Sequence, residues 1–288
     1  ISLRNLDTGN YERHFGFDRE IWAIAFNPRG RVLATANDDD TVRLWRRGTG
    51  QLLHVLHDHS GRVRSIAYSP DGSLLATGCD DRDVRIWNAH DGTLVARMSG
   101  HTDRVHAVCF SPDGGLVVSA SLDGTARVWT AQGELRREFT EHTGQLWAAA
   151  FHPDGLIATA GDDLVVRVWD PDTGQVVHTF EGHQRSVWAL VFSPDGTTLA
   201  SGGDDGTTRL WHLAGDDAGL DLTLAGLPEG WAAMTTRGQY KVQGRVNGHL
   251  WYAIGACRFE IGQLDEFLPQ VRELPLGAEF DLRSPAAR

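Results

Sequence analysis

The chain has 288 residues, of which 41% are hydrophobic and 23% charged, a composition typical of a soluble globular protein. This composition excludes a chain that is disordered throughout, and no stretch approaches the ~20 consecutive apolar residues that a transmembrane helix needs. The formal net charge of −11 speaks against nucleic acid as a partner, because an acidic chain repels phosphate backbones.

The cysteines and the first residues bear on where the protein works. Cys79, Cys109 and Cys257 are odd in number and widely spaced, and no CxxC pair occurs. We therefore expect no structural disulfide, no zinc site and a cytoplasmic location. The residues after Ile1 lack the charged and apolar stretches of a signal peptide. The chain also starts without Met, from which we expect the downstream part of a longer protein.

The chain then repeats itself about every 42 residues. Each repeat has a Pro-containing turn such as FSPDG, a short apolar run such as VLATA, an Asp-containing turn, and an alternating segment such as TVRLW. Alternation of apolar and polar residues is typical of a half-buried strand, and a Gly-containing turn then starts a fourth strand. The alternating segments end at Trp45, Trp87, Trp129, Trp169 and Trp211, spaced 42, 42, 40 and 42 residues apart.

These motifs resemble WD40 repeats over roughly residues 1–224. The resemblance implies an all-β WD40 β-propeller, in which four-stranded antiparallel sheets surround a central channel. One repeat cannot bury both of its faces alone, so neighbouring repeats stack and share a core. We expect five full blades, at residues 15–56, 57–98, 99–139, 140–180 and 181–224.

The two ends of the chain are expected to complete the ring. Residues 1–14 match the last two strands of a repeat, with Asn5 in place of the signature Trp, and residues 231–243 match the first two. We therefore predict a propeller over residues 1–243 with six blades, the sixth shared by both ends, because closure removes exposed sheet edges. The alternative is a ring of seven or more blades, part of which lies outside this chain.

Residues 244–288 depart from the repeat and are too apolar for a free tail, since they contain Trp251, Tyr252 and Phe259. We expect this C-terminal extension to pack on the propeller, with residues 263–275 as a short helix or an extended arm. It resembles the endings of bacterial multidomain signalling or defence proteins.

The resemblance also implies a buried tetrad of His, Ser or Thr, Asp and Trp in each repeat. In the first repeat Phe17 stands where His is expected, so we expect blade one to be the loosest. The tetrad looks like a catalytic triad, but five near-copies do not make one active site, and buried polar groups need such partners in any case. We therefore assign structural tetrads and no catalytic residue. The tetrad residues are Thr35, Asp39 and Trp45; His59, Thr77, Asp81 and Trp87; His101, Ser119, Asp123 and Trp129; His142, Thr159, Asp163 and Trp169; and His183, Ser201, Asp205 and Trp211.

Propellers of this family mostly bind proteins or peptides on the face that carries the connections between blades. On that face, the exposed positions lie three and five residues after the tetrad His and just before the tetrad Asp. They predict an aromatic arc and a basic sector, and Trp and Arg are the residue types most enriched at binding hot spots. The alternative is that these Trp pack between blades or against the tail, and that the Arg pair with nearby Asp. The aromatic arc is Trp22, Trp147, Trp188 and Trp231, and the basic sector is Arg62, Arg64, Arg104 and His106.

The sequence thus predicts a non-catalytic module that binds a protein or peptide, acting as sensor or scaffold of a larger bacterial protein. An upstream effector domain of the same polypeptide is a candidate partner, and we expect no membrane to be involved. No GxxxxGK[ST], HExxH or GxSxG motif occurs, so we expect neither a cofactor nor a metal. Two alternatives stay open: an enzyme with a site in the central funnel, and a purely structural spacer, which predicts a buried Trp arc.

Overall fold

The computed structural model describes residues 2–4, 11–14, 20–214, 218–236, 239–244, 251–254, 257–260 and 272–280. Within these ranges all regular structure is β-strand. The same residues contain no helix that is long and apolar enough to cross a membrane.

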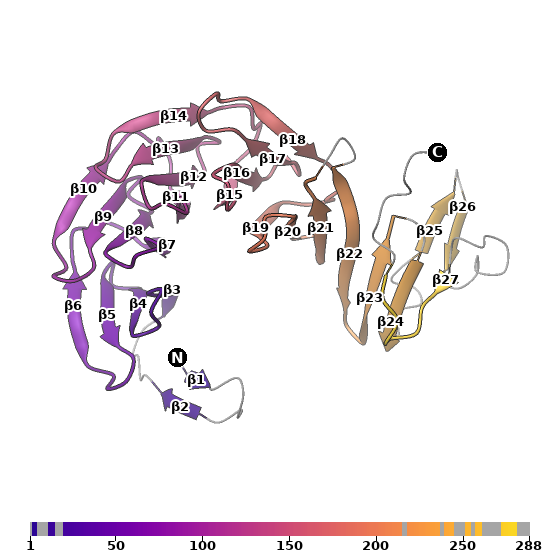
Figure 1. Cartoon of the computed structure of the whole chain (residues 1–288), viewed down its shortest axis with the longest axis horizontal. Coiled ribbons are helices and arrows are strands. Elements are labelled where there is room, and N and C mark those ends of the chain that lie inside the picture. The colour runs from indigo at the N-terminus through magenta and orange to yellow at the C-terminus, as the bar shows by residue number, and fades with distance from the viewer. Residues whose placement is uncertain are drawn as a thin grey trace.

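Five consecutive four-stranded units follow the chain around a central opening, as the sequence predicted (Figure 1). In each blade the strands pair antiparallel in chain order, and the first strand lies innermost. The all-β propeller architecture is therefore confirmed. Blade one is β3 (Ile21–Phe26), β4 (Val32–Asn37), β5 (Val42–Arg46) and β6 (Leu52–Leu56). Blade two is β7 (Val63–Tyr68), β8 (Leu74–Cys79), β9 (Val84–Asn88) and β10 (Leu94–Met98). Blade three is β11 (Val105–Phe110), β12 (Leu116–Ser121), β13 (Ala126–Thr130) and β14 (Leu135–Phe139). Blade four is β15 (Leu146–Phe151), β16 (Ile157–Gly161), β17 (Val166–Trp169) and β18 (Val176–Phe180). Blade five is β19 (Val187–Phe192), β20 (Thr198–Gly203), β21 (Thr207–His212) and β22 (Gly219–Leu227).

The Pro-Asp-Gly turns connect the first and second strands of a blade. In blade two the Ser69 hydroxyl donates to Asp71 Oδ1 over 2.6 Å, and the Ser73 N–H donates to the same oxygen over 3.0 Å. Gly72 completes this turn at a φ of 76°, a left-handed conformation that strains any residue with a Cβ. The sequence therefore fixes the strand boundaries locally.

The hydrophobic core lies between blades, because each blade packs one sheet face against its neighbour. One cluster joins Val42 and Leu44 of blade one to Ile66 and Leu75 of blade two. The second strands of blades two to four, β8, β12 and β16, are almost fully buried along their length, because both of their faces meet an adjacent blade.

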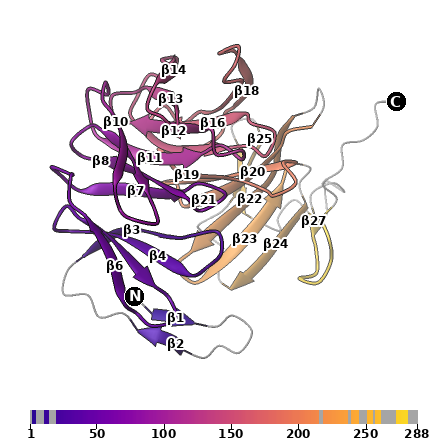
Figure 2. The same ribbon diagram turned by 60° about the vertical axis from the view of Figure 1, so that its left-hand side comes forward.

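The sixth blade that we predicted from the two termini is not formed among the described residues. β1 (Ser2–Arg4) and β2 (Tyr11–His14) pair only with each other. β23 (Gly230–Thr235) and β24 (Gln239–Gly244) instead continue the sheet of β22 (Figure 2). The reason is the connection: Leu227 pairs with Gly230, so a two-residue hairpin holds β23 on the edge of β22.

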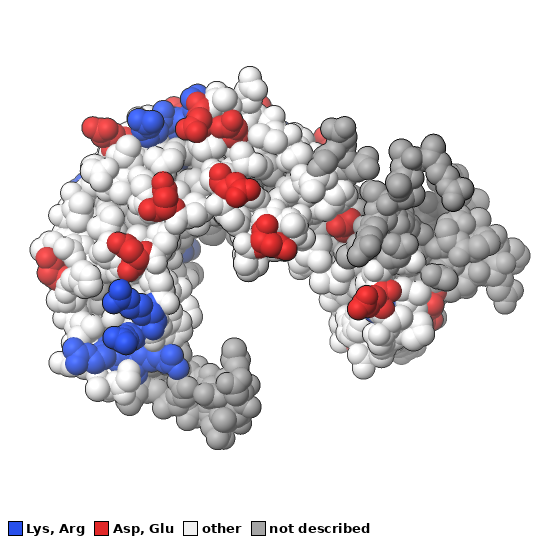
Figure 3. Space-filling model, viewed as in Figure 1, with Lys and Arg blue, Asp and Glu red and all other residues white. Residues whose placement is uncertain are grey.

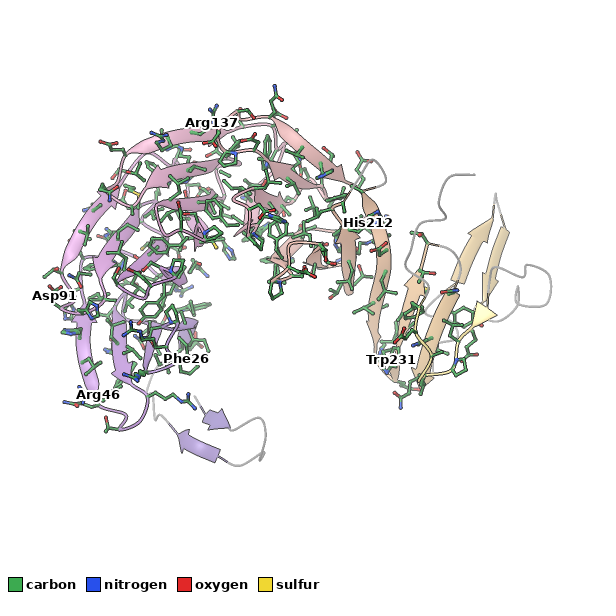
Figure 4. The ribbon with its side chains drawn as sticks, viewed as in Figure 1. Phe26, Arg46, Asp91, Arg137, His212 and Trp231 are labelled. Atoms are coloured by element: carbon green, nitrogen blue, oxygen red, sulfur yellow. The ribbon has the colours of Figure 1, made fainter. Side chains whose placement is uncertain are left out.

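The free side of blade one shows what such a blade would cover. Ile24 and Phe26 are 54% and 42% exposed, whereas the equivalent Val108 and Phe110, which pack against blade two, are 6% exposed each. Figure 4 shows Phe26 beside the central opening. The number of blades stays a prediction.

The described part of the C-terminal extension forms a separate hairpin and a short strand that lies along β24. β25 (Trp251–Ile254) and β26 (Cys257–Glu260) form a hairpin, and β27 (Arg272–Glu273) pairs with β24 in parallel. The Leu274 N–H donates to the Tyr240 carbonyl over 2.8 Å, and Lys241 Nζ donates to the Leu276 carbonyl over 3.3 Å. The C-terminal end of the predicted helix or arm is thus extended, and its residues 263–271 lie outside the described residues.

A candidate partner-binding face

The tetrads form buried chains of hydrogen bonds. In blade three the Trp129 indole N–H donates to Ser119 Oγ over 2.9 Å. His101 Nε2 lies 2.8 Å from the same oxygen, and His101 Nδ1 lies 2.9 Å from Asp123 Oδ2. A carboxylate only accepts, so Nδ1 carries the proton and Nε2 accepts from the serine hydroxyl. Burial opposes ionisation of Asp123, but the bonds from His101 and the Thr102 N–H hold its pKa well below the usual range.

Blades four and five repeat this arrangement, with distances of 2.7–3.0 Å along the chain from Trp to Asp. Ser119, Thr159 and Ser201 are 0% exposed. Their hydroxyls therefore have no access to a substrate and serve to pair buried polar groups.

Blades one and two depart from the pattern. In blade two the tetrad Asp81 is hydrogen-bonded by Arg85, which donates from Nη1 and Nη2 over 3.1 and 2.8 Å. Burial and then the charge of Arg85 lower the pKa of His59 to about 4, so His59 is neutral near pH 7.

In blade one Thr35 accepts from the Trp45 N–H over 3.0 Å, and the expected histidine position, Phe17, lies outside the described residues. Asp39 is bound by Thr41 and Arg43. Trp45 is partly exposed, whereas the other four signature Trp are at most 3% exposed. The looser packing of blade one stays a prediction.

Each innermost strand carries a β-bulge at its second residue. In blade two Val63 pairs with Cys79 and Ser65 with Gly78, which leaves Arg64 opposite no residue. A bulge re-aims its side chain and is common beside functional sites. The same irregularity falls at the equivalent positions of the other blades, so the fold brings five side chains to one face. They are Trp22, Arg64, His106, Trp147 and Trp188.

Three of these side chains form an aromatic cluster, which we define as His106, Trp147 and Trp188. The Trp147 and Trp188 ring centroids lie 4.3 Å apart, and the His106 ring lies 4.8 Å from Trp147 and 6.3 Å from Trp188. His106 Nδ1 is 3.0 Å from the Trp147 carbonyl oxygen. Burial, and the nearby charge of Arg64, lower the pKa of His106. His106 therefore belongs with the aromatic residues as a neutral ring and not with the basic sector.

The cluster has one fixed and one free indole. Asp162 Oδ1 accepts from the Trp147 N–H over 2.6 Å and from the Ser186 hydroxyl over 2.6 Å, which holds Trp147 in place. Trp188 is 45% exposed, and its N–H donates to none of the described residues. Trp188 is thus the side chain of the cluster that is open to a partner.

The predicted basic sector is largely neutralised. Arg64 donates to both carboxylate oxygens of Asp80 over 2.8 Å each, and Arg62 Nε lies 3.7 Å from Asp38. The hydrogen bond to Asp80 raises the pKa of Arg64. The two guanidinium carbons lie 4.7 and 5.0 Å from the centroid of Trp22, so they cover that ring. Charges and aromatics are therefore interleaved rather than divided into two sectors.

The remaining predicted residues lie apart from the aromatic cluster. Arg104 is exposed at the edge of blade three. Trp231 is 37% exposed on β23, where its N–H donates to Gln243 Oε1 over 2.9 Å. Figure 4 shows Trp231 on the hairpin beyond blade five, so the four Trp do not form one arc.

Sequence reasoning placed the exposed positions and weighed the pairing of Arg with nearby Asp as an alternative, but it missed that an Asp also holds Trp147. Asp80 and Asp162 stand at the same offset, just before the tetrad Asp, and they bind the bulged residues Arg64 and Trp147. Their recurrence at one position of the repeat was the signal that the sequence offered.

Comparison with known proteins agrees with this geometry. The family model "WD domain, G-beta repeat" matches residues 8–46, 50–88, 92–130, 133–170 and 174–212. The chain is also similar to the eukaryotic translation initiation factor 3 subunit I of Phaeosphaeria nodorum (strain SN15), at 43% identity over 47 residues. That match covers 16% of this chain and 13% of the length of that protein.

Proposed function

We propose, since the chain belongs to the WD-repeat family, that it binds a partner protein on the face that carries the bulged residues. WD40 repeats point to a protein-interaction scaffold, and a relative that is named as a subunit of a larger factor fits a non-catalytic role. The same face is where equivalent positions of all five blades converge.

The exposed aromatic cluster is the observation that supports this proposal most. Large apolar side chains that are exposed as a group indicate an interaction site, and Trp is enriched at binding hot spots. Trp188 stands beside a second indole that Asp162 holds rigid, so an incoming side chain meets a preformed surface. A purely structural spacer predicts buried Trp, whereas Trp22, Trp188 and Trp231 are 37%, 45% and 37% exposed.

The geometry also indicates which kind of segment binds here. Asp38 and Asp80 offset the charges of Arg62 and Arg64, so the face favours an apolar or aromatic anchor over an acidic one. The free N–H of Trp188 suits a backbone carbonyl of that segment. This partner chemistry differs from that of the basic sector which we expected from the sequence, because Arg62 and Arg64 are paired with Asp38 and Asp80.

An enzyme in the central funnel finds less support. The Ser, His and Asp side chains that resemble a triad are buried and bound to one another. Among the described residues no group of three or more His, Cys, Asp or Glu is placed to hold a metal ion. We further propose that the module works in the cytoplasm as sensor or scaffold of a larger bacterial protein, with an effector domain of the same polypeptide as a candidate partner.

The experiment is an affinity purification from the native host with wild-type protein, the Trp188→Ala variant and the Trp231→Ala variant as a matched control. We expect one set of proteins that wild type and W231A retain and that W188A loses. A retained protein is then purified, and its Kd is measured by calorimetry, with about a tenfold or greater loss expected for W188A. Equal affinity for W188A and wild type, with unchanged circular dichroism, contradicts the proposed face.

A further inference from the structure

Blade one carries four arginines at the ends of its strands, which we call the arginine patch: Arg29, Arg31, Arg46 and Arg47. Arg29 and Arg31 flank Gly30 in the turn between β3 and β4, and the register pairs Val32 with Arg46. The Arg47 N–H donates to the Arg31 carbonyl over 2.9 Å, so the two short segments lie side by side.

The arginine patch lies on the opposite face of the ring from the aromatic cluster. Trp22 stands at the start of β3, and the turn that carries Arg29 follows its end at Phe26. At about 3.3 Å per residue, the two ends of the strand are well separated. Figure 3 shows basic side chains gathered over blade one, where Figure 4 labels Arg46.

The other blades show that the fold does not require arginine at these positions. The equivalent residues are Asp71, Ser73, Asn88 and Ala89 in blade two; Asp113, Gly115, Thr130 and Ala131 in blade three; and Asp195, Thr197, His212 and Leu213 in blade five. Those sets carry one carboxylate and no arginine, although the turns have the same backbone pairing. The four positive charges are a property of blade one.

Arg29 is also released from the role that the equivalent aspartate has in the turn. In blade two Asp71 accepts the hydrogen bonds that close the turn. In blade one Asn27 Oδ1 accepts from the N–H groups of Arg31 and Val32, over 2.8 and 3.0 Å. The side chain of Arg29 is therefore not part of the turn.

Three of the four guanidinium groups of the patch are available to a partner. Arg29, Arg31 and Arg46 are exposed and form no ion pair with any of the described residues. Several arginines of other blades are held by carboxylates, as Arg64 is by Asp80 and Arg85 by Asp81. Clustered like charges repel one another, and an anionic partner relieves that repulsion.

The surroundings limit the size of that partner. The acidic turn of blade two abuts the patch, because a Cβ at Gly72 would lie 3.1 Å from Pro28 Cδ. Asp113 and Asp154 occupy the same turn in the next blades, and Figure 3 shows acidic side chains spaced along the ring. A long polyanion across this face meets the whole series of carboxylates, whereas a short segment over blade one has, among the described residues, only the Asp71 carboxylate beside it.

We propose that the arginine patch binds a short acidic segment of a partner protein. Guanidinium groups pair with carboxylates through two parallel N–H···O bonds, which gives direction as well as charge. This surface is separate from the aromatic cluster, so the protein offers two independent contacts on opposite faces.

The test replaces three residues by those that blade two already tolerates, in the variant R29D/R31S/R46N. Fluorescence anisotropy measures binding of a labelled six-residue Asp/Glu peptide and of its Asn/Gln counterpart at about 50 mM salt, where screening is modest. Wild type is expected to bind the acidic peptide at least about tenfold more tightly than the variant does, with an affinity that falls as salt rises. Equal binding by wild type and variant, or equal binding of both peptides, overturns the proposal.

A charge-matched control separates the patch from net charge. The variant R104S/R136N/R185D changes exposed arginines elsewhere by the same total charge and is expected to stay within about twofold of wild type. A loss as large as that of the patch variant contradicts a local site. A duplex DNA oligonucleotide or a phosphatidylserine vesicle that binds the patch more tightly than the acidic peptide also overturns the proposal. W188A is expected to keep peptide binding, so failure here and failure of the proposed partner face are distinguishable.

Discussion

We expect the hydroxyl at the centre of a tetrad to contribute more to the free energy of unfolding when more buried groups are hydrogen-bonded to it. Thr159 in blade four and Thr35 in blade one are the same residue type, and both are 0% exposed. Thr159 Oγ1 lies 2.7 Å from Trp169 Nε1 and 2.8 Å from His142 Nε2. Thr35 Oγ1 accepts from the Trp45 N–H over 3.0 Å and donates to Asn37 Oδ1 over a long 3.4 Å. Substitution by Val removes the hydroxyl while keeping the branched shape that suits a strand.

The expected cost follows from the groups left unpaired. An unsatisfied buried donor or acceptor costs about 1–3 kcal/mol. Thr159→Val leaves two such groups without a partner, the Trp169 indole N–H and His142 Nε2. We therefore expect it to lower the free energy of unfolding by about 2–5 kcal/mol. Thr35→Val removes the bond to a partly exposed indole and the long bond to Asn37, and we expect a loss of about 0.5–2 kcal/mol.

Guanidinium chloride unfolding followed by far-ultraviolet circular dichroism measures both values, provided that the m-values agree. The reasoning is refuted if T35V costs as much as T159V at equal m. Such a result would mean that the tetrad bonds contribute nothing beyond the volume of the side chain.

Two further predictions concern His59 and the turn glycines. Because burial holds the pKa of His59 near 4 against 6.5 when exposed, its native state binds fewer protons than the unfolded chain. The stability advantage of wild type over His59→Gln is therefore full above pH 6.5 and shrinks as the pH falls toward 4; a difference that does not change over this range contradicts the buried neutral ring. Gly72 has a φ of 76° and faces Pro28, so Gly72→Ala is expected to lower the free energy of unfolding by about 1–2 kcal/mol. Gly48, where a Cβ would have no atom of the described residues within 4 Å, is the control, and equal losses for G72A and G48A in thermal unfolding contradict the predicted strain at Gly72.

Much of this fold was accessible from the sequence because each element is encoded locally. The Pro-Asp-Gly turns, the alternating strands and the signature Trp recur within each repeat, so their strand order and inner placement followed directly. The two ends of the chain were different. GWAAM has the pattern of a first strand, but Pro228 and Glu229 form a hairpin too short to leave the edge of β22.

For the candidate site too, the sequence predicted the positions of residues within each repeat but not the contacts between blades. The repeat offset placed Trp147, Trp188 and His106 at equivalent positions, yet their mutual contact depends on how neighbouring blades are spaced. The pairing of Arg64 with Asp80 was weighed as an alternative, but side-chain geometry decides it.

What the sequence determined by itself is the repeating blade, because turns, alternation and tetrad residues act within about forty residues of one another. Only the tertiary structure decided which charges are balanced. Arg64 is neutralised by Asp80 across two paired strands, whereas Arg29, Arg31 and Arg46 gather at one corner of blade one and form no ion pair with any of the described residues. Ion pairing depends on distances between segments that a linear pattern does not contain.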